Sequence, residues 1–459
     1  MLALPAPAGL PAAGWRTAAV GVAMAVWWMT EAMPLAATAL VPLVAFPLLG
    51  IAGIDATAAP YANPVIFLFL GGFIIAAALE ECGLHRRVAL AIVHVSGTRP
   101  RGLVAGFMAA TAVISMWVSN TATVVMMLPM ALAVVAWHDE RPDATPAFAP
   151  ALLLGLAFSA SIGGLGTLIG TPPNALLAGF MAEAYDVRLG FLEWMTFGVP
   201  LVLVGVPLAW LVLTRVVFRL PAGADTADAA GDGAGMLGDR HAPLSRGEWI
   251  AGGVTALTAA AWLSRPVLER WIPGLSDAGI AIAGALLLFL LPADRGWRTV
   301  VSWSRVERLP WGTLILFGGG LTLAAAIQSS GLAEWIGGGM RILASWPLPL
   351  IIVAIAATVI FLSELASNTS VAAVFLPVVG SVAVSLGAPP LVLALAAAVS
   401  ASTAFMLPVG TPPNAIVYGS GRLTIGQMMR AGFLLDLAFI FIVTMAVLWL
   451  APLVFAAAR

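Results

Sequence analysis

Two short polar sequences interrupt an otherwise apolar chain, and each of them occurs twice. Ser-Asn-Thr occupies residues 119–121 and again 367–369, and Gly-Thr-Pro-Pro-Asn occupies residues 170–174 and again 410–414. Hydroxyl and carboxamide oxygens suit a weakly bound hard cation such as Na⁺, and a proline frees further carbonyl oxygens by removing a helical donor. Hydroxyl and carboxamide donors and the N-terminal ends of half-helices suit an anion. These residue types therefore predict a site for small ions.

The tripeptides belong to longer repeats. A single Ser-Asn-Thr would carry little weight, because Ser, Thr and Asn in membrane helices often bond to the preceding turn or to a neighbouring helix. An offset of 248 residues, however, also pairs Ser115 with Ser363 and aligns residues 65–84 with 313–332. The two Gly-Thr-Pro-Pro-Asn sequences are related by 240 residues, and the difference falls in the loop 138–146. Broken helices at corresponding positions of two halves indicate the binding site of a transporter.

The composition is typical of a helical membrane protein with many crossings. Of 459 residues, 61% are hydrophobic and only 9% are charged, and the mean hydropathy is +1.02. The sequence contains no zinc-binding histidine pair, nucleophile elbow or phosphate loop, and its net charge is −1. Cys82 is the only cysteine, which excludes an intrachain disulfide. We therefore expect a multi-pass protein of the cell (inner) membrane in contact with lipid, neither an enzyme nor a binder of nucleic acid.

The first tripeptide lies in the middle of a long uncharged segment. No charged residue separates Arg101 from Trp137, a length too great for one membrane helix of about 20 residues and too short for two. This length favours a re-entrant hairpin at 100–137 with its turn deep in the membrane, and the repeat predicts a second hairpin at 347–387. Unpaired polar groups at that depth cost several kcal/mol each, so the turns should face a cavity or a ligand.

The predicted fold class is all-α and polytopic, with two inverted repeats. Each repeat has five crossings, an interfacial arm, a re-entrant hairpin and a broken helix. Residues 1–220 form the first repeat, with its broken helix at 149–184; residues 221–246 are a flexible cytoplasmic linker rich in Gly, Ala and Asp; and residues 247–459 form the second repeat, with its broken helix at 390–420. The remaining expected helices are 15–33, 35–52, 65–83, 191–219, 247–264, 275–291, 309–331 and 425–455, with arms at 84–97 and 332–346.

The arginines predict the orientation in the membrane. All 21 basic residues are arginine, and an odd number of crossings per repeat places the two halves upside down relative to one another. If the first hairpin opens to the cytoplasm, 15 arginines lie inside and six outside, in agreement with the positive-inside rule. Both termini would then lie outside.

The polar motifs themselves contain no arginine, which affects the expected mechanism. An oxyanion at membrane depth needs its charge compensated, and bound Na⁺ is the compensation that these motifs provide. Glu364 lies three residues before Ser367, and either a proton-coupling or a structural role is compatible with this position. For Asp436 and Glu31 we expect hydrogen bonds between helices.

The sequence resembles the divalent anion:sodium symporters, a family of dicarboxylate, citrate and sulfate carriers. The resemblance runs from Trp27 to the end of the chain, and its most specific parts are the paired Ser-Asn-Thr sequences and residues 401–417, which are similar to the family signature. It implies a homodimer in which a transport domain moves past a scaffold as an elevator. It also implies Na⁺ as the coupling ion, without an organic cofactor. The family usually has eleven crossings, and residues 1–14 resemble only the tail of the first.

The resemblance also implies which residues bind the ions. The first Na⁺ site would consist of Ser115, Ser119, Asn120 and Gly170, and the second of Ser363, Ser367, Asn368 and Gly410. Substrate carboxylates would contact Asn120, Thr121, Asn368, Thr369, Thr411 and Pro412, with Thr171 and Pro172 at the matching positions of the first half.

The predicted function is Na⁺-coupled uptake of C4-dicarboxylates such as succinate, malate and fumarate. The alternatives within transport are a sodium-independent dicarboxylate exchanger, in which we expect a basic group where a sodium ion would sit, and a sodium-coupled citrate or sulfate transporter. A channel also uses re-entrant hairpins, but its filter repeats in one orientation, whereas these hairpins enter from opposite sides. An intramembrane enzyme is disfavoured because the helices contain no paired Asp, Ser-Lys or metal-ligand set.

Overall fold

The computed structural model describes residues 5–95, 97, 99–141, 144–221, 243–293, 298–340 and 345–456. Within these ranges the chain is helical, apart from loops and one isolated β-bridge between Pro292 and Thr299, which confirms the predicted all-α class. Most of the predicted linker, residues 222–242, lies outside the described residues.

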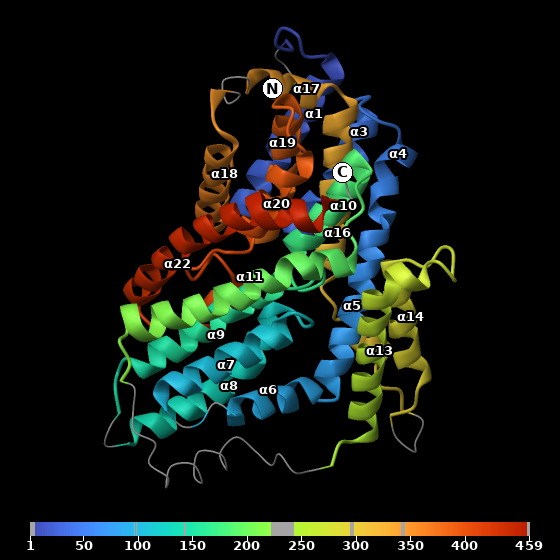
Figure 1. The fold of residues 1–459 in the computed structure, drawn as a ribbon. Coiled ribbons are helices and arrows are strands. Elements are labelled where there is room, and N and C mark those ends of the chain that lie inside the picture. Colours follow the sequence, from blue (N-terminus) through green and yellow to red (C-terminus); the bar gives the residue numbers. More distant parts are fainter. Residues whose placement is uncertain are drawn as a thin grey trace.

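The helices of the first half follow the order expected from the sequence (Figure 1). They are α1 (Ala12–Thr30), α2 (Leu35–Thr38), α3 (Val41–Leu48), α4 (Ile54–Ala58), the 3-10 helix η1 (Ala59–Ala62), α5 (Pro64–Glu81), α6 (Leu84–Val95), α7 (Pro100–Ser115), α8 (Asn120–Asp139), α9 (Phe148–Gly164), α10 (Pro172–Tyr185), α11 (Phe191–Leu211) and the π-helix η2 (Val212–Val217).

The second half contains the remaining helices. Its helices are α13 (Arg246–Leu268), α14 (Asp277–Leu290), α15 (Trp303–Val306), α16 (Trp311–Ser329), α17 (Leu332–Gly339), α18 (Leu348–Ser363), α19 (Asn368–Ser385), α20 (Pro390–Ala401), α21 (Pro412–Tyr418), α22 (Ile425–Met445), the π-helix η4 (Ala446–Leu450) and α23 (Ala451–Val454).

Two sequence predictions about these helices are wrong, and proline explains both. The helix expected at 35–52 is divided into α2 and α3, because Pro42 lies in the first turn of a new helix. The breaks were expected within Gly-Thr-Pro-Pro-Asn, but they span 165–171 and 402–411, and the prolines begin α10 and α21. A proline in the first helical turn loses no hydrogen bond, so it starts a helix more readily than it interrupts one.

Six helical stretches are long and apolar enough to cross a membrane. They are Ile54–Glu81, Asn120–Asp139, Phe191–Val217, Trp311–Ser329, Asn368–Ser385 and Ile425–Val454. Six further apolar helices of 10–17 residues, including α7, α9 and α18, are shorter. Length and composition do not determine which helices traverse the bilayer, so ten crossings remain a prediction.

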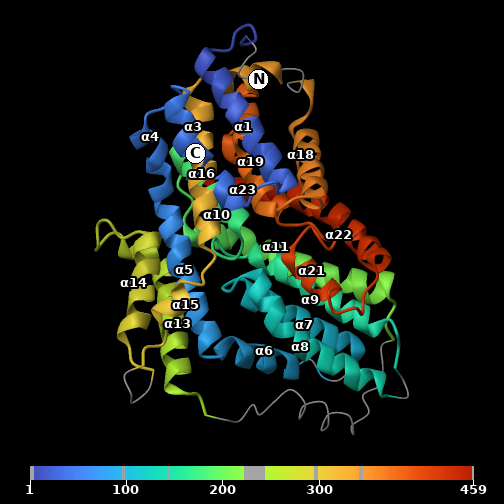
Figure 2. The ribbon, with the colours of Figure 1, turned by 180° about the vertical axis from the view of Figure 1, so that it is seen from behind.

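The two halves interlock around two buried helices. Every residue of α9 is buried, as is nearly all of α20, so each of these helices is apolar on all sides. In the first half α7 and α8 pack against α9, and in the second α18 and α19 pack against α20. After each break the chain crosses to the other half, because α10 packs against α19 and α20 while α21 packs against α8 and α9. This exchange brings both breaks to the middle of the molecule (Figures 1 and 2).

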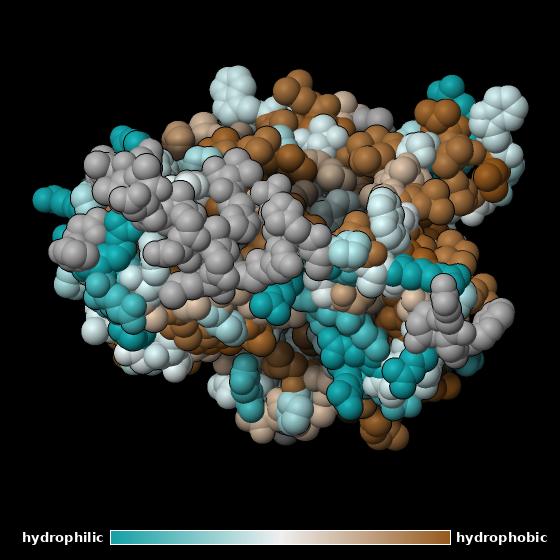
Figure 3. Space-filling model, turned by 90° about the horizontal axis from the view of Figure 1, so that it is seen from below, coloured by the Kyte–Doolittle hydropathy of each residue, from teal (hydrophilic) through white to brown (hydrophobic). Residues whose placement is uncertain are grey.

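Helices α5, α13 and α14 form a separate group at one side of the molecule (Figure 1), in which α14 packs along α5 and against α13. At its lower end an ion pair between Arg87 Nε of α6 and Glu248 Oε1 of α13 joins the two halves. Seen from below, this end carries a cluster of hydrophilic side chains (Figure 3).

Candidate functional site

Both Ser-Asn-Thr turns and both Gly-Thr-Pro-Pro-Asn sequences line one cavity of about 1110 Å³. Of the predicted site residues, those on its wall are Ser119, Asn120, Thr121, Gly170, Thr171 and Pro172 from the first half, and Ser367, Asn368, Thr369, Gly410, Thr411 and Pro412 from the second. The two others, Ser115 and Ser363, are fully buried at the ends of α7 and α18. The structure thus brings together residues that lie about 250 positions apart in the sequence.

The first turn is held by its own polar side chains. Ser119 is the N-cap of α8, and its Oγ accepts a hydrogen bond from Ala122 N at 3.3 Å. Ser115 Oγ lies 2.6 Å from Asn120 Oδ1 and 2.8 Å from the carbonyl oxygen of Ala160 in α9. These contacts fix the Asn120 carboxamide between the turn and the end of α9.

The first break lies directly against this turn. Asn174 Nδ2 donates hydrogen bonds to the carbonyl oxygens of Gly164 (3.1 Å) and Thr167 (2.8 Å), and so holds the extended segment between α9 and α10. A Cβ atom on Gly164 would stand 2.7 Å from Asn120 Oδ1 and 3.1 Å from the carbonyl oxygen of Gly170. Carboxamide and backbone oxygens therefore converge at this point, as the ligands of a hard cation do.

The second break is built on the same plan with one difference. Asn414 Nδ2 donates to the carbonyl oxygens of Leu407 (3.1 Å) and Ala404 (3.5 Å), each 240 residues beyond its counterpart in the first half. Here, however, Glu364 accepts hydrogen bonds from Met406 N and Leu407 N, both at 2.7 Å. The carboxylate thereby orders the middle of the break.

The residue aligned with Glu364 in the first half is Met116, whose carbonyl oxygen accepts a hydrogen bond from Thr167 Oγ1 instead. The hydrogen bonds of Glu364 to the break support the structural role considered for it. Asp436 Oδ1 accepts a hydrogen bond from Phe405 N at 3.3 Å, so this residue joins two elements as expected. The expectation for Glu31 is wrong. It is the left-handed C-cap of α1 (φ 50°), it is exposed on the cavity wall, and it forms no hydrogen bond to any described residue.

Several buried oxygens of the turns and breaks have no hydrogen-bond donor among the described residues. They are Ser363 Oγ, Asn368 Oδ1, Ser402 Oγ, Asn174 Oδ1 and Asn414 Oδ1. A buried acceptor without a partner is costly, and a small cation is one ligand that removes this cost. The oxygens present therefore fit Na⁺. Asn174 and Asn414 were not among the ligands implied by the resemblance, although their occurrence in both copies of the motif was a signal for them.

The cavity also contains two arginines that no sequence motif assigned to the site. Arg305 and Arg308 line its wall, and Arg305 Nη2 forms an ion pair with Glu80 Oε2 of α5. Both arginines come from the segment that precedes α16, which shares no motif with the turns. The only signal for them was their closeness in sequence to the repeated segment 313–332.

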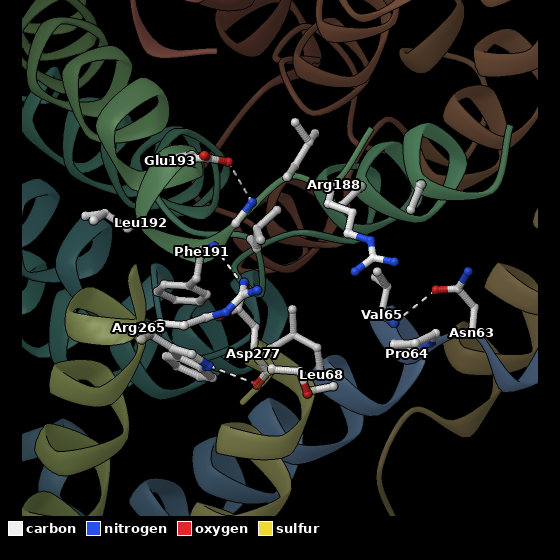
Figure 4. A pocket seen from close by; sticks show the side chains of 18 of the residues that line it. Asn63, Pro64, Val65, Leu68, Arg188, Phe191, Leu192, Glu193, Arg265 and Asp277 are labelled. Carbon is white, nitrogen blue, oxygen red and sulfur yellow. Dashed lines mark hydrogen bonds and ion pairs between the residues drawn. The ribbon is translucent and has the colours of Figure 1, made fainter. Parts of the chain in front are cut away.

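A second cavity, of about 570 Å³, contains none of the predicted site residues (Figure 4). It lies where the start of α5, the α10–α11 connection and the facing ends of α13 and α14 meet. Asp277 Oδ2 accepts hydrogen bonds from Arg265 Nη1 (3.0 Å) and from Phe191 N (3.1 Å), and the Phe191 ring stacks on Trp262 at 4.1 Å. These contacts join α11 to α13 and α14.

The sequence matches one family model along almost its whole length. Residues 1–456 match the model described as "Sodium:sulfate symporter transmembrane region". Among curated relatives, the sodium-dependent dicarboxylate transporter SdcS of Staphylococcus saprophyticus is 38% identical over 97% of this chain and 88% of its own. The protein of the same name from Staphylococcus aureus is 39% identical over 98% of this chain and 88% of its own.

Solved structures of two other transporters have a similar fold at low sequence identity. The YdaH transporter of Alcanivorax borkumensis superposes with a TM-score of 0.62 at 18% identity, over 94% of this chain and 98% of its own. MtrF of Neisseria gonorrhoeae, described as one of a class of antimetabolite efflux pumps, superposes with a TM-score of 0.59 at 15% identity, over 96% of this chain and 95% of its own.

Proposed function

Because the chain belongs to the sodium:sulfate symporter family, whose members are membrane transporters and not enzymes, we propose that it couples the uptake of C4-dicarboxylates to the entry of Na⁺. The substrates would be succinate, malate and fumarate. The curated relatives are named as sodium-dependent dicarboxylate transporters. The observation that carries the proposal is that both turns and both breaks line one cavity.

The ends of the helices around this cavity favour an anion at its centre. Helices α8 and α19 begin at residues that line it, Asn120 and Asn368, and the residues of their first turns carry backbone N–H groups. Helix N-termini present free N–H groups and a partial positive charge. The side chains of Asn120, Thr121, Asn368 and Thr369 add donors that can hydrogen-bond a carboxylate at either end of a short dicarboxylate.

The opposite helix ends favour cations beside that anion. Helices α7, α9 and α18 end at Ser115, Gly164 and Ser363, next to the turns and the first break, and helix C-termini carry carbonyl oxygens and partial negative charge. We propose one Na⁺ at Ser115, Ser119, Asn120 and Gly170 and a second at Ser363, Ser367, Asn368 and Gly410. A dianion at membrane depth needs compensating charge, so bound Na⁺ raises the affinity for the anion and the anion raises that for Na⁺.

The proposed movement is that of an elevator built from two inverted repeats. The crossing of α10 and α21 into opposite halves supports the repeat. We propose that α7–α11 and α18–α22, which carry the turns and breaks, move together past a scaffold that includes α5, α13, α14 and α16. We also propose a homodimer, which places apolar side chains exposed on α13, such as Trp249 and Leu257, against a partner or lipid.

For the orientation, we propose that the first hairpin opens to the cytoplasm. The lower end of the molecule, where Arg87 of α6 and Glu248 of α13 form an ion pair, carries the hydrophilic cluster of Figure 3, and this polar end supports the proposed orientation. If one net positive charge enters per cycle, a membrane potential of about 100 mV contributes roughly 2.3 kcal/mol, or on the order of 50-fold accumulation.

The test is uptake of radiolabelled succinate into proteoliposomes of the purified protein. We expect uptake that requires an inward Na⁺ gradient and stops when choline or K⁺ replaces Na⁺. Uptake that is indifferent to this replacement excludes the proposed coupling. Competition by malate, citrate, α-ketoglutarate, aspartate and sulfate identifies the preferred anion, and stronger inhibition by citrate or sulfate than by malate favours a citrate or sulfate transporter.

A sodium-independent dicarboxylate exchanger is the second candidate, and the arginines on the cavity wall favour it. Exchange needs a basic group in place of Na⁺, and Arg305 and Arg308 are the basic residues of this lining. Two observations argue against exchange. The ion pair of Arg305 with Glu80 neutralises one of the two positive charges, and neither arginine belongs to a turn or break. Succinate uptake that requires succinate inside the vesicles, and no Na⁺, would favour exchange.

A further inference from the structure

The cavity has more room and more charge than a four-carbon anion held by the turns requires. Its volume of about 1110 Å³ exceeds the roughly 300–1,000 Å³ of pockets that enclose drug-sized ligands. Succinate is much smaller than such ligands, so an anion at the turns leaves part of the cavity to water and to further groups. The charged residues of the wall are Glu31, Glu80, Arg305 and Arg308.

Arg308 is the arginine of this wall whose charge is not neutralised by an ion pair to a described residue. Arg305 is paired with Glu80, and both side chains are partly buried, with 36% and 22% of their surfaces exposed. Arg308 is exposed to the cavity, and no carboxylate of the described residues lies within ion-pair distance of it. A guanidinium offers planar paired N–H donors that match the two oxygens of a carboxylate.

The surroundings of Arg308 strengthen its attraction for an anion. The same wall contains the apolar side chains of Leu35, Phe73, Leu309 and Leu316, which lower the local dielectric and screen a charge less than bulk water does. Arg308 also lies just before α16, outside the turns and breaks. An anion can therefore contact Arg308 and the turns at different points of the same cavity.

We propose that Arg308 forms an outer binding position of the cavity, at which its guanidinium holds one carboxylate of the dianion while the anion is bound in the cavity. This proposal rests on the proposed function and names a residue that adds to the turns and breaks. The ligand class is a small dicarboxylate. Arg308 binds it by a charge-assisted contact, whereas Na⁺ supplies the compensation at the turns.

The test is equilibrium binding of radiolabelled succinate to the purified, detergent-solubilised protein in excess Na⁺, because binding in detergent does not depend on vesicle orientation. A charge-assisted hydrogen bond contributes roughly 1.5–3 kcal/mol, so Arg308→Gln should weaken succinate binding by about 10-fold or more. Arg308→Lys should weaken it less, since it keeps the charge without the paired donors. The matched control is Arg430→Gln on α22, another exposed arginine that does not line the cavity.

A purely structural role of Arg308 would lower the amount of folded protein without changing its response to salt. We therefore expect the Kd of the wild-type protein for succinate to rise with ionic strength at constant Na⁺, and that of Arg308→Gln to rise less steeply.

An unchanged Kd in Arg308→Gln overturns the proposal, as does an equal loss of succinate affinity in Arg430→Gln. If Arg308→Gln does not fold, Arg308→Lys carries the test, and wild-type affinity in that variant contradicts the predicted paired contact. Absence of Na⁺-dependent succinate binding in the wild type contradicts the proposed function instead.

Discussion

Gly164 and Asn120 are in contact across the first turn, since a Cβ atom on Gly164 would stand 2.7 Å from Asn120 Oδ1. The end of α9 thereby touches the turn between α7 and α8 without an intervening side chain. A cation bound by the Asn120 carboxamide and the neighbouring carbonyl oxygens is then held by two elements at once. At the corresponding position of the second half the chain has Ala404.

Gly164→Ala should weaken the first cation site. The added methyl group has to displace Asn120 or the backbone of the break, and such overpacking costs typically 1–3 kcal/mol. We expect the Na⁺ concentration for half-maximal uptake to rise by about 10-fold, measured in proteoliposomes over a range of Na⁺ at saturating succinate. The control is Gly253→Ala, because a Cβ atom there meets nothing within 4 Å. A wild-type Na⁺ dependence in Gly164→Ala would show that this contact is not part of a cation site.

Asn120→Ala and Asn368→Ala should each abolish Na⁺-dependent uptake while expression and oligomer size stay unchanged. Each asparagine is proposed to bind both Na⁺ and the substrate. Its removal therefore takes an oxygen ligand from the Na⁺ and a hydrogen-bond donor from the substrate. The measurement is initial uptake of succinate, normalised to protein that elutes as a single species in size-exclusion chromatography. Thr196→Ala is a suitable control, because Thr196 is exposed and bonds only to Leu192 O in its own helix. Wild-type rates in either asparagine variant would refute the site assignment.

The repeated motifs made much of this site predictable. Two identical pentapeptides and two identical tripeptides cannot both be accidental, and their offsets place the turns and breaks in equivalent helices of the two halves. The exact place of each break was not predictable from the prolines alone. Pro172 and Pro412 begin helices. The carbonyl oxygens that lose their helical N–H donor therefore belong to residues before these prolines, and the carbonyl oxygen of Gly164 is one of them.

The charged part of the cavity could not be predicted in the same way. Arg305 and Arg308 reach the cavity because the segment before α16 packs beside the end of α5, and that contact depends on the packing of the whole chain. Glu31 illustrates the same limit. Its sequence position, after an apolar helix, is compatible with a buried hydrogen bond, but it lies one residue beyond the end of α1 and faces the cavity.

Glu364→Ala should destabilise the protein more than Glu364→Gln. The alanine variant leaves Met406 N and Leu407 N without their acceptor, and an unsatisfied buried donor costs about 1–3 kcal/mol. Glutamine keeps one oxygen and so one of the two hydrogen bonds. We expect the midpoint of thermal unfolding, followed by tryptophan fluorescence, to fall in the order wild type, Gln, Ala.

The same pair of variants separates the structural role of Glu364 from a proton-coupling role. A structural carboxylate predicts that Glu364→Gln retains Na⁺-driven uptake at a rate reduced in line with its stability. Loss of all uptake in a Glu364→Gln protein that unfolds at the wild-type temperature would instead indicate that this carboxyl group carries a proton during transport.

The stacked pair Phe191 and Trp262 provides a test of the proposed movement. Phe191 begins α11, on the part proposed to move, and Trp262 lies in α13, on the proposed scaffold, with their ring centroids 4.1 Å apart. In a Cys82→Ser background, Phe191→Cys with Trp262→Cys can be bridged by a short reagent that reacts with two thiols. Because the bridge ties the two parts together, we expect uptake to stop while Na⁺-dependent succinate binding in detergent persists.

The matched control pair is Phe289→Cys with Trp303→Cys. Both residues lie on the scaffold side, with their ring centroids 6.1 Å apart, so bridging them should leave uptake intact. Continued uptake by fully bridged Phe191→Cys/Trp262→Cys protein would contradict an elevator in which α11 moves past α13.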